Sequence, residues 1–247
     1  MSDPGAGPSG PGSPLSDVAE SLADAAQARP RDTTGPTTVR STRDFGARPH
    51  IPLADVASLN PVSQLLDARR SIRSGGAIAV ASLASLLLAS NRVITFGTAD
   101  DGYTRSWRPN PSAGGRHPID ILVDARQVNG LDPGAYWFDA VHWSLRPELD
   151  LETSLINARA ATADAVATES PPGAILFLVA QFERTGSRYD HPASLVWRDA
   201  GALLATVQFA ATGVGLSSCA AGISGTLSLP DGGVDVGAVV LGPGVPA

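Results

Sequence analysis

The sequence contains no lysine, because all 18 of its basic residues are arginine. This absence excludes a Schiff-base lysine and the lysine of a Walker-type phosphate loop. There is one cysteine, Cys219, so an internal disulfide and a cysteine-rich zinc site are both excluded. Cys219 lies in an apolar segment and is interpreted as a small core residue. Nothing here requires an oxidising compartment, and the cytoplasm is the expected location.

Long apolar runs are also missing. The longest candidates, residues 77–88 and 174–180, are too short to span a bilayer. Residues 1–16 lack the basic and apolar regions of a signal peptide. A net charge of −6 disfavours nucleic-acid binding. Four histidines and one cysteine give little basis for a metal cluster. From these observations we expect no metal, no membrane contact and no nucleic-acid partner.

Glycine and proline are abundant, with 26 and 20 residues, and much of this content lies near the N-terminus. Residues 1–48 carry few large apolar side chains and therefore indicate an arm without a packed core. Such an arm is either disordered or wrapped around a partner subunit. Residues 49–247 are predicted to form a single compact domain.

Hydrophobic periodicity in the compact part predicts a mixture of helices and strands. Helices are expected from 60 to 72, where Asn60-Pro61 is a typical helix start, and over 82–90, 151–167 and 190–212. Strands are expected over 118–125, 173–182, 216–221 and 236–241, with a hairpin over 134–145. Since helices and strands do not alternate strictly, the pattern favours an α+β fold with a central sheet over a doubly wound parallel one.

Three segments carry residues suited to chemistry. The first is the arginine box, defined as Arg69, Arg70, Ser71, Ile72 and Arg73 at the end of a predicted helix. Guanidinium groups offer planar forks of donors that suit a phosphate. Spacing alone favours a plainer interpretation, a solvated basic face at a helix C-terminus.

The second segment runs from Arg108 to Pro118 and reads RPNPSAGGRHP. Its small residues leave backbone amides accessible to a ligand, and it leads directly into a predicted strand. An ordinary rigid loop is the alternative. The dinucleotide fingerprint GxGxxG is absent at this position.

The third segment, residues 184–191, joins a buried strand to the long helix. Tyr189 and His191 can donate or accept protons if they are desolvated. The alternative is a helix-entry loop in which Asp190 is the cap. Further along, residues 217–222 form a strand end of small residues against which a flat ring could lie.

In their order and spacing these segments resemble the FMN-dependent nitroreductase superfamily. The resemblance is greatest to the streptolysin-type azoline dehydrogenases of ribosomal peptide biosynthesis, and it covers roughly residues 61 to 242. Beyond the three segments it includes residues 128–139, reading VNGLDPGAYWFD, and Asp199-Ala200-Gly201 in the long helix. It implies a nitroreductase-like α+β fold with a mostly antiparallel sheet flanked by helices, a homodimer, and FMN bound at the subunit interface.

Carried over by motif, the resemblance implies roles for individual residues. Arg69, Ser71 and Arg73 would hold the phosphate and ribityl chain, Arg70 would contribute through its backbone, and the loop before strand 118–125 would line the flavin. The residues at the end of strand 216–221 would pack behind the ring. The implied cofactor site consists of Arg69, Arg70, Ser71, Arg73, Pro111, Ser112, Ala113, Gly114, Gly115, Ala220, Ala221 and Gly222.

The resemblance also implies the reaction and the catalytic pair. In the azoline dehydrogenases a base removes a ring proton while hydride passes to the flavin, which yields a thiazole or oxazole. The family's Lys-Tyr pair is Arg188-Tyr189 here, and its helix motif Asp-Ala-Gly-His ends in Ala202. Arginine stays protonated and cannot be the base, but Arg188 could hold negative charge or make Tyr189 more acidic.

Three functions follow from these residues. The first is an FMN-dependent dehydrogenase or oxidase acting on a peptide-derived substrate, with a cyclodehydratase or another biosynthetic protein as a partner. The second is a reductive nitroreductase-type enzyme using a nicotinamide donor. The third, suggested by the lysine and histidine departures, is a flavin-binding or scaffold subunit without catalysis.

Overall fold

The computed structural model describes residues 29–30, 43–44, 46, 51–53, 62–168 and 170–244. Most of the predicted arm, and the expected helix start at Asn60-Pro61, lie outside the described residues. Within them, no helix is long and apolar enough to cross a membrane.

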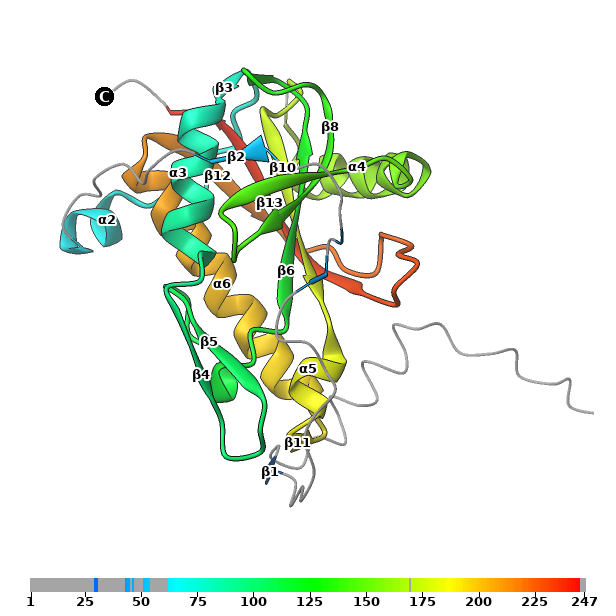
Figure 1. Ribbon diagram of the computed structural model, residues 1–247. Coiled ribbons are helices and arrows are strands. Elements are labelled where there is room, and N and C mark those ends of the chain that lie inside the picture. The colour runs from blue at the N-terminus through cyan, green and yellow to red at the C-terminus, as the bar shows by residue number, and fades with distance from the viewer. Residues whose placement is uncertain are drawn as a thin grey trace, which may run out of the picture.

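A seven-stranded sheet forms the centre of the molecule (Figure 1). All its neighbouring strands pair antiparallel, which confirms the expected sheet type. Its order across the sheet is β12 (Leu216–Ala221), β13 (Val234–Pro243), β10 (Ala174–Ala180), β6 (Ile119–Ala125), β8 (Gly134–Asp139), β9 (Ser144–Glu148) and β2 (Ile51–Pro52).

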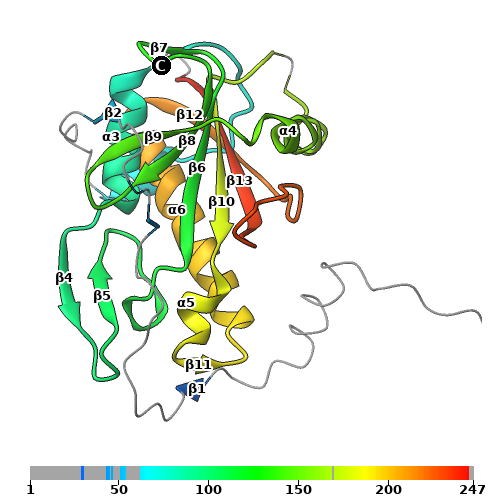
Figure 2. The ribbon, with the colours of Figure 1, turned by 45° about the vertical axis from the view of Figure 1, so that its right-hand side comes forward.

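Helices cover both faces of the sheet, as Figure 2 shows. Helices α3 (Val80–Asn91) and α6 (Ala193–Gly213) pack on one face, and α4 (Glu152–Val166) packs on the other. The alternation of side chains along β6 explains these two cores: Ile121 and Val123 contact the α3 and α6 side, whereas Leu122 joins the α4 side. The sheet is buried on both faces, so its strands are apolar almost throughout.

The long helix begins three residues later than the sequence predicted. Asp190 is not its cap, because Tyr189–Asp190 forms the short strand β11 and Pro192 occupies the N-cap position. Strand β1 (Arg29–Pro30) pairs antiparallel with β11. A short helix, α5 (Phe182–Gly186), fills the space between β10 and β11.

Two elements lie beside α6, and a third lies outside the main sheet. A hairpin of β4 (Thr95–Thr98) and β5 (Thr104–Trp107), which the sequence reading missed, lies beside the N-terminal half of α6 (Figure 1). Helix α2 (Val62–Ala68) packs on α6 nearer its other end. The parallel pair β3 (Ile78–Ala79) and β7 (Val128–Asn129) lies outside the main sheet.

Candidate functional site

The arginine box directly follows α2, which ends at Ala68 and not at residue 72 as the sequence predicted. The Arg69 amide donates to the Leu65 carbonyl at 2.9 Å, and this bond ends the helix. Arg70 turns its guanidinium back onto the helix end, where Nη1 donates to the carbonyls of Asp67 (2.7 Å) and Arg69 (2.9 Å). The Arg70 side chain is therefore engaged at the end of its own helix.

The box and the following Ser74 pack against two strands of the sheet, β12 and β13. The Ile72 amide donates to the Ser218 carbonyl at 2.9 Å, and the Ser74 and Ser217 hydroxyls lie 2.5 Å apart. A Cβ atom at Gly242 would overlap the Ser74 carbonyl oxygen, so glycine is required for this close approach. The box is thus a rigid ledge beside β12.

Two arginines of this ledge are available to a ligand. Arg69 is half-buried and Arg73 is exposed, and neither side chain has an ion pair or hydrogen bond within the described part of the chain. Ser71 is exposed as well. The strand that anchors the box also carries Ala220 and Ala221 before it ends, and a Cβ atom at the following Gly222 would meet no atom within 4 Å. The structure therefore brings the box and this small-residue strand end together. We call them the phosphate half-site, after the role that the resemblance implies for the box.

The predicted loop at Pro111–Gly115 contains a single turn of 3-10 helix, η1 (Ala113–Gly115). Gly114 and Gly115 have φ angles of 60° and 66°, which side-chain-bearing residues rarely adopt. The two glycines let the chain turn sharply between β5 and β6, and Gly114 remains exposed. This geometry fits a loop that a ligand can approach closely.

Asp199 on α6 holds this loop in place. Its carboxylate accepts a 2.5 Å hydrogen bond from the Ser112 hydroxyl and bonds at 3.2 Å from the Ala113 amide. The Ser112 oxygen in turn accepts from the His117 amide at 2.8 Å. Burial raises the pKa of Asp199, although the bonds from Ser112 and Ala113 oppose this shift. Ser112 therefore holds the loop in its own conformation. Asp199, which the sequence motif included, is a positioning residue that fixes this loop to α6.

The predicted catalytic residue Tyr189 meets the same loop. A Cβ atom built on Gly114 would lie 2.9 Å from the Tyr189 hydroxyl oxygen. That hydroxyl has no hydrogen bond among the described residues. Its neighbour Arg188 points to another group, with Nη1 3.8 Å from Asp101 Oδ2. Tyr189, Arg188 and the Pro111–Gly115 loop form what we call the loop half-site.

A buried ion pair that the sequence reading missed supports the loop half-site. Arg116 donates to Asp101, stacks on the Tyr103 ring at 3.8 Å, and reaches Ser187 Oγ at 3.2 Å. Burial works against the charged form of Asp101, but the bonds from Arg116 and the Tyr103 amide outweigh it and lower the pKa of this carboxyl. The sequence could not predict this ion pair, because Asp101 and Arg116 are 15 positions apart. The turn residues Asp101-Gly102 were the one local signal in the sequence.

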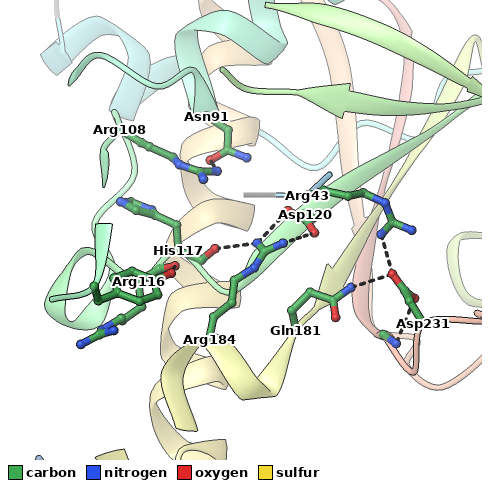
Figure 3. A network of polar contacts seen from close by, with 11 residues as sticks. Arg43, Asn91, Arg108, Arg116, His117, Asp120, Gln181, Arg184 and Asp231 are labelled. Atoms are coloured by element: carbon green, nitrogen blue, oxygen red, sulfur yellow. Dashed lines mark hydrogen bonds and ion pairs between the residues drawn. The ribbon is translucent and has the colours of Figure 1, made fainter. Parts of the chain in front are cut away.

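A second buried pair ties the Tyr189 segment to the sheet (Figure 3). The Arg184 guanidinium makes two parallel bonds to the Asp120 carboxylate, at 2.8 and 2.7 Å, and a third to the His117 carbonyl at 3.1 Å. Such bidentate pairs fix orientation as well as distance. The pair connects β6 to α5, directly before Arg188 and Tyr189.

Burial also lowers the pKa of two residues near this pair, His117 and Arg108. Burial first, and then the nearby charge of Arg108, lowers the pKa of His117 to about 3. Burial lowers the pKa of Arg108 itself to about 10, and its direct hydrogen-bond partners are the neutral side chains of Ser106 and Asn91. His117 is therefore a neutral structural residue rather than a general acid. Among the described residues, no group of three His, Cys, Asp or Glu side chains could hold a metal ion.

The two half-sites lie at opposite ends of α6 within one chain. The loop half-site is attached near the helix N-terminus through Asp199, while the box contacts Ser218, just beyond the C-terminus. Asp199 and the helix end at Gly213 are 14 positions apart, or about 21 Å at the rise of an α-helix. In Figure 1 the β4–β5 hairpin lies beside the N-terminal half of α6, whereas α2 lies nearer its C-terminal end.

Comparisons with known proteins agree with this architecture. No protein-family model matches the chain. A protein of Methanocaldococcus jannaschii that is provisionally named a nitroreductase is 28% identical over 181 residues, which is 72% of this chain and 86% of that protein.

Solved structures share this fold. A structure from Ralstonia eutropha, also provisionally described as a nitroreductase, matches 90% of this chain and 100% of its own with a TM-score of 0.59 and 19% identity. A chain of the Escherichia coli microcin synthetase McbBCD complex with truncated pro-MccB17 bound matches 94% of both chains with a TM-score of 0.54 and 16% identity. The fold is nitroreductase-like.

Proposed function

We propose that the chain is an FMN-dependent dehydrogenase or oxidase. Its substrate is peptide-derived and belongs to natural-product biosynthesis of the thiazole and oxazole type. One observation carries this proposal: the Tyr189 hydroxyl, which has no hydrogen bond among the described residues, lies 2.9 Å from the Cβ position of Gly114, in the loop that the motif assigns to the flavin. A proton-transfer group and a ligand-accessible loop thus meet at one place.

The residues fit the cofactor that the nitroreductase family uses. Arg69 and Arg73 lie on a rigid ledge without carboxylate partners in the described chain, which suits a phosphate group. Ser71 and the backbone of Arg70 would complete that end. Pro111–Gly115 and Ala220–Gly222 offer small side chains, against which the ring system would lie.

A homodimer would assemble the site from both half-sites. The exposed Gly201 lies near the middle of α6, and a Cβ atom there would meet nothing within 4 Å. With the nearby small Ala205 it allows a second helix to approach closely. A twofold axis that crosses α6 between Asp199 and the helix end, near Ala205, would place each chain's loop half-site beside the other chain's phosphate half-site, because the two flank α6 at opposite ends.

Bound flavin would supply hydride acceptance, and the chain would supply proton transfer and orientation. The Tyr189 hydroxyl is the group placed to move a proton at the substrate ring. Arg188 stays cationic and already faces Asp101 at 3.8 Å, so it acts through its charge and not as the base. Asp199 and the Asp120–Arg184 pair hold the loop and the tyrosine in register.

The substrate class rests on the motif resemblance and on the microcin synthetase match. That protein is part of a complex with truncated pro-MccB17 bound, which supports a peptide-derived substrate and a biosynthetic partner for this chain, such as a cyclodehydratase. The relative named as a nitroreductase favours a second candidate, a nicotinamide-dependent reductase.

The visible spectrum of the purified protein tests cofactor binding. We expect the absorption bands of oxidised flavin, either as isolated or after addition of FMN. A colourless protein that takes up no added FMN would overturn both enzyme proposals. Sedimentation of the flavin-loaded protein then tests the composite site, which requires a dimer.

Two anaerobic assays separate the candidates. Bleaching of the flavin by an azoline-containing peptide, without a nicotinamide, supports the dehydrogenase. Steady turnover of NADPH with a nitroaromatic acceptor, and no bleaching by the peptide, would instead establish the reductase.

A further inference from the structure

A groove of about 600 Å³ lies on the α4 side of the sheet, the face opposite α3 and α6. Its floor is the indole of Trp137 on β8, and its walls come from the end of β9 and the loop before β13. We call it the Trp137 groove. Its lining residues are Arg43, Trp137, Glu148, Asp150, Leu151, Ser228, Leu229, Pro230 and Asp231.

A guanidinium already occupies part of this groove. Arg43 lies with its guanidinium carbon 3.6 Å from the centre of a Trp137 ring. Its Nη1 lies 2.8 Å from Asp231 Oδ2, as Figure 3 shows. Its side chain is only 15% exposed. Stacking on an aromatic face together with a carboxylate contact is how proteins recognise arginine.

Other hydrogen bonds orient Asp231 and Trp137, the two side chains that Arg43 contacts. Asp231 accepts hydrogen bonds from Gln181 Nε2 and from the Gly233 amide, each at 3.2 Å. The Trp137 indole donates to Glu148 Oε2, also at 3.2 Å. The groove is therefore built from oriented partners and does not depend on Arg43 to order it.

Its charge also favours a cation. Glu148, Asp150 and Asp231 line the groove, and Arg43 is the one basic residue among its lining residues. Burial lowers the pKa of Arg43, while Asp120, Asp231 and Glu148 counteract that shift. Removal of Arg43 would leave three carboxylates around an aromatic floor.

Arg43 comes from a segment that precedes the sheet in the sequence. It precedes β2, whose Ile51 and Pro52 pair with Leu145 and Ser144 on β9, at the edge of the sheet. The Trp137 groove lies beside that same strand, at Glu148. The guanidinium therefore comes from a segment N-terminal to the sheet, and the arginine of a separate peptide could take the same place.

We propose that the Trp137 groove is a binding site for an arginine side chain carried by a peptide. Arg43 occupies the part of the groove at Trp137 and Asp231 in cis, and an arginine peptide binds there when Arg43 is displaced or removed. The site lies on the opposite face of the sheet from α6 and does not depend on flavin.

Calorimetry on the full-length Arg43→Ala variant tests this proposal. The probe is the acetylated peptide amide Ser-Thr-Arg-Asp-Phe-Gly, which has the sequence of residues 41–46. We expect Arg43→Ala to bind it at least tenfold more tightly than the wild type, and to discriminate at least tenfold against the same peptide with citrulline in place of arginine. Adding Asp231→Asn to this variant should weaken binding at least tenfold. Arg126→Ala, which removes an exposed arginine outside the groove, should behave as the wild type.

Binding to Arg43→Ala no tighter than to the wild type, or equal binding of the citrulline peptide, would overturn the proposal. Hydrogen exchange on the wild type keeps the test valid if the variant does not fold. A saturating excess of the arginine peptide should speed exchange at the Gly46 amide, which the neighbouring Asp44 carboxylate holds at 2.9 Å. Unchanged exchange there would show that Arg43 is a permanent structural anchor.

Discussion

The Tyr189 hydroxyl faces the position where a Cβ atom of Gly114 would lie, across two segments that are 75 positions apart in the sequence. A Cβ atom on Gly114 would approach the hydroxyl oxygen to 2.9 Å, so a side chain there would displace the tyrosine. This proximity links the residue suited to proton transfer with the loop suited to a flat ligand. The following predictions test this arrangement and the groups that support it.

Replacing Tyr189 by phenylalanine should slow turnover without releasing flavin. Loss of a positioned proton-transfer group costs about 10²-fold or more in kcat. The flavin dissociation constant should change by less than about threefold, since a single hydroxyl lost to solvent contributes little. Stopped-flow kinetics and flavin titration measure the two quantities. Tyr136→Phe removes a hydroxyl bonded to the Asp132 carbonyl and serves as the control; full activity of Tyr189→Phe would show that Tyr189 is structural.

The double variant Arg69→Ala/Arg73→Ala should release flavin. Each charge-assisted contact to a phosphate is worth about 1.5–3 kcal/mol, so losing both should raise the FMN dissociation constant by about 100-fold or more. Quenching of FMN fluorescence measures this change. Arg126→Ala removes an equal charge elsewhere and should bind flavin as the wild type does. Undiminished flavin absorbance in the double variant would refute the phosphate half-site.

Asp199→Asn should change how stability depends on pH. Burial raises the pKa of Asp199 in the folded protein above its value in the unfolded chain, so the folded state binds the proton more tightly. The stability that Asp199 contributes is therefore fully present below the unfolded-chain pKa, and it is lost as pH rises through the raised folded value. Urea unfolding of both proteins from pH 4 to pH 7 should show the wild type losing stability relative to the variant. A constant difference across this range would contradict the shift.

His117 should remain neutral in the folded protein at pH 5. Its pKa is lowered to about 3, whereas an unfolded chain titrates near about 6.5. Because the folded pKa is the lower one, its contribution to stability is complete above the unfolded value and declines as pH falls toward 3. Nitrogen-15 NMR of the imidazole measures the charge directly, with the urea-unfolded protein as reference. A protonated His117 at pH 5 would disprove its burial as a neutral group.

Asp120→Ala should destabilise the fold strongly, because it leaves the buried Arg184 guanidinium without its carboxylate. Breaking a buried pair in this way costs about 3–5 kcal/mol of unfolding free energy, measured by urea denaturation. The matched control is Glu152→Ala, which breaks an exposed ion pair with Arg159 and should cost less than about 1 kcal/mol. The double variant Asp120→Leu/Arg184→Met should recover most of the loss; failure to recover it would locate the cost in packing.

Local sequence predicted most of the secondary structure. Strand β12 has the predicted bounds, and α3, α4, β6 and β10 lie within two residues of them, because periods of 3.6 and 2 record which side chains face a core. The start of α6 was misplaced by three residues, since the pairing of Asp190 in β11 is a tertiary contact. The β4–β5 hairpin was missed because its strands are mostly exposed and carry little apolar alternation.

The sequence by itself determined the candidate chemistry: an arginine box, a small-residue loop, a tyrosine preceded by arginine, and no lysine at all. The tertiary structure decided how these parts are arranged. It separated the box from the loop along α6, and it brought Asp120 to Arg184, which is 64 positions away. It also placed Arg43 on Trp137. The physical reason is that periodicity and turn chemistry act over a few residues, whereas burial of charge and closure of a site depend on which distant segments the packed sheet brings into contact.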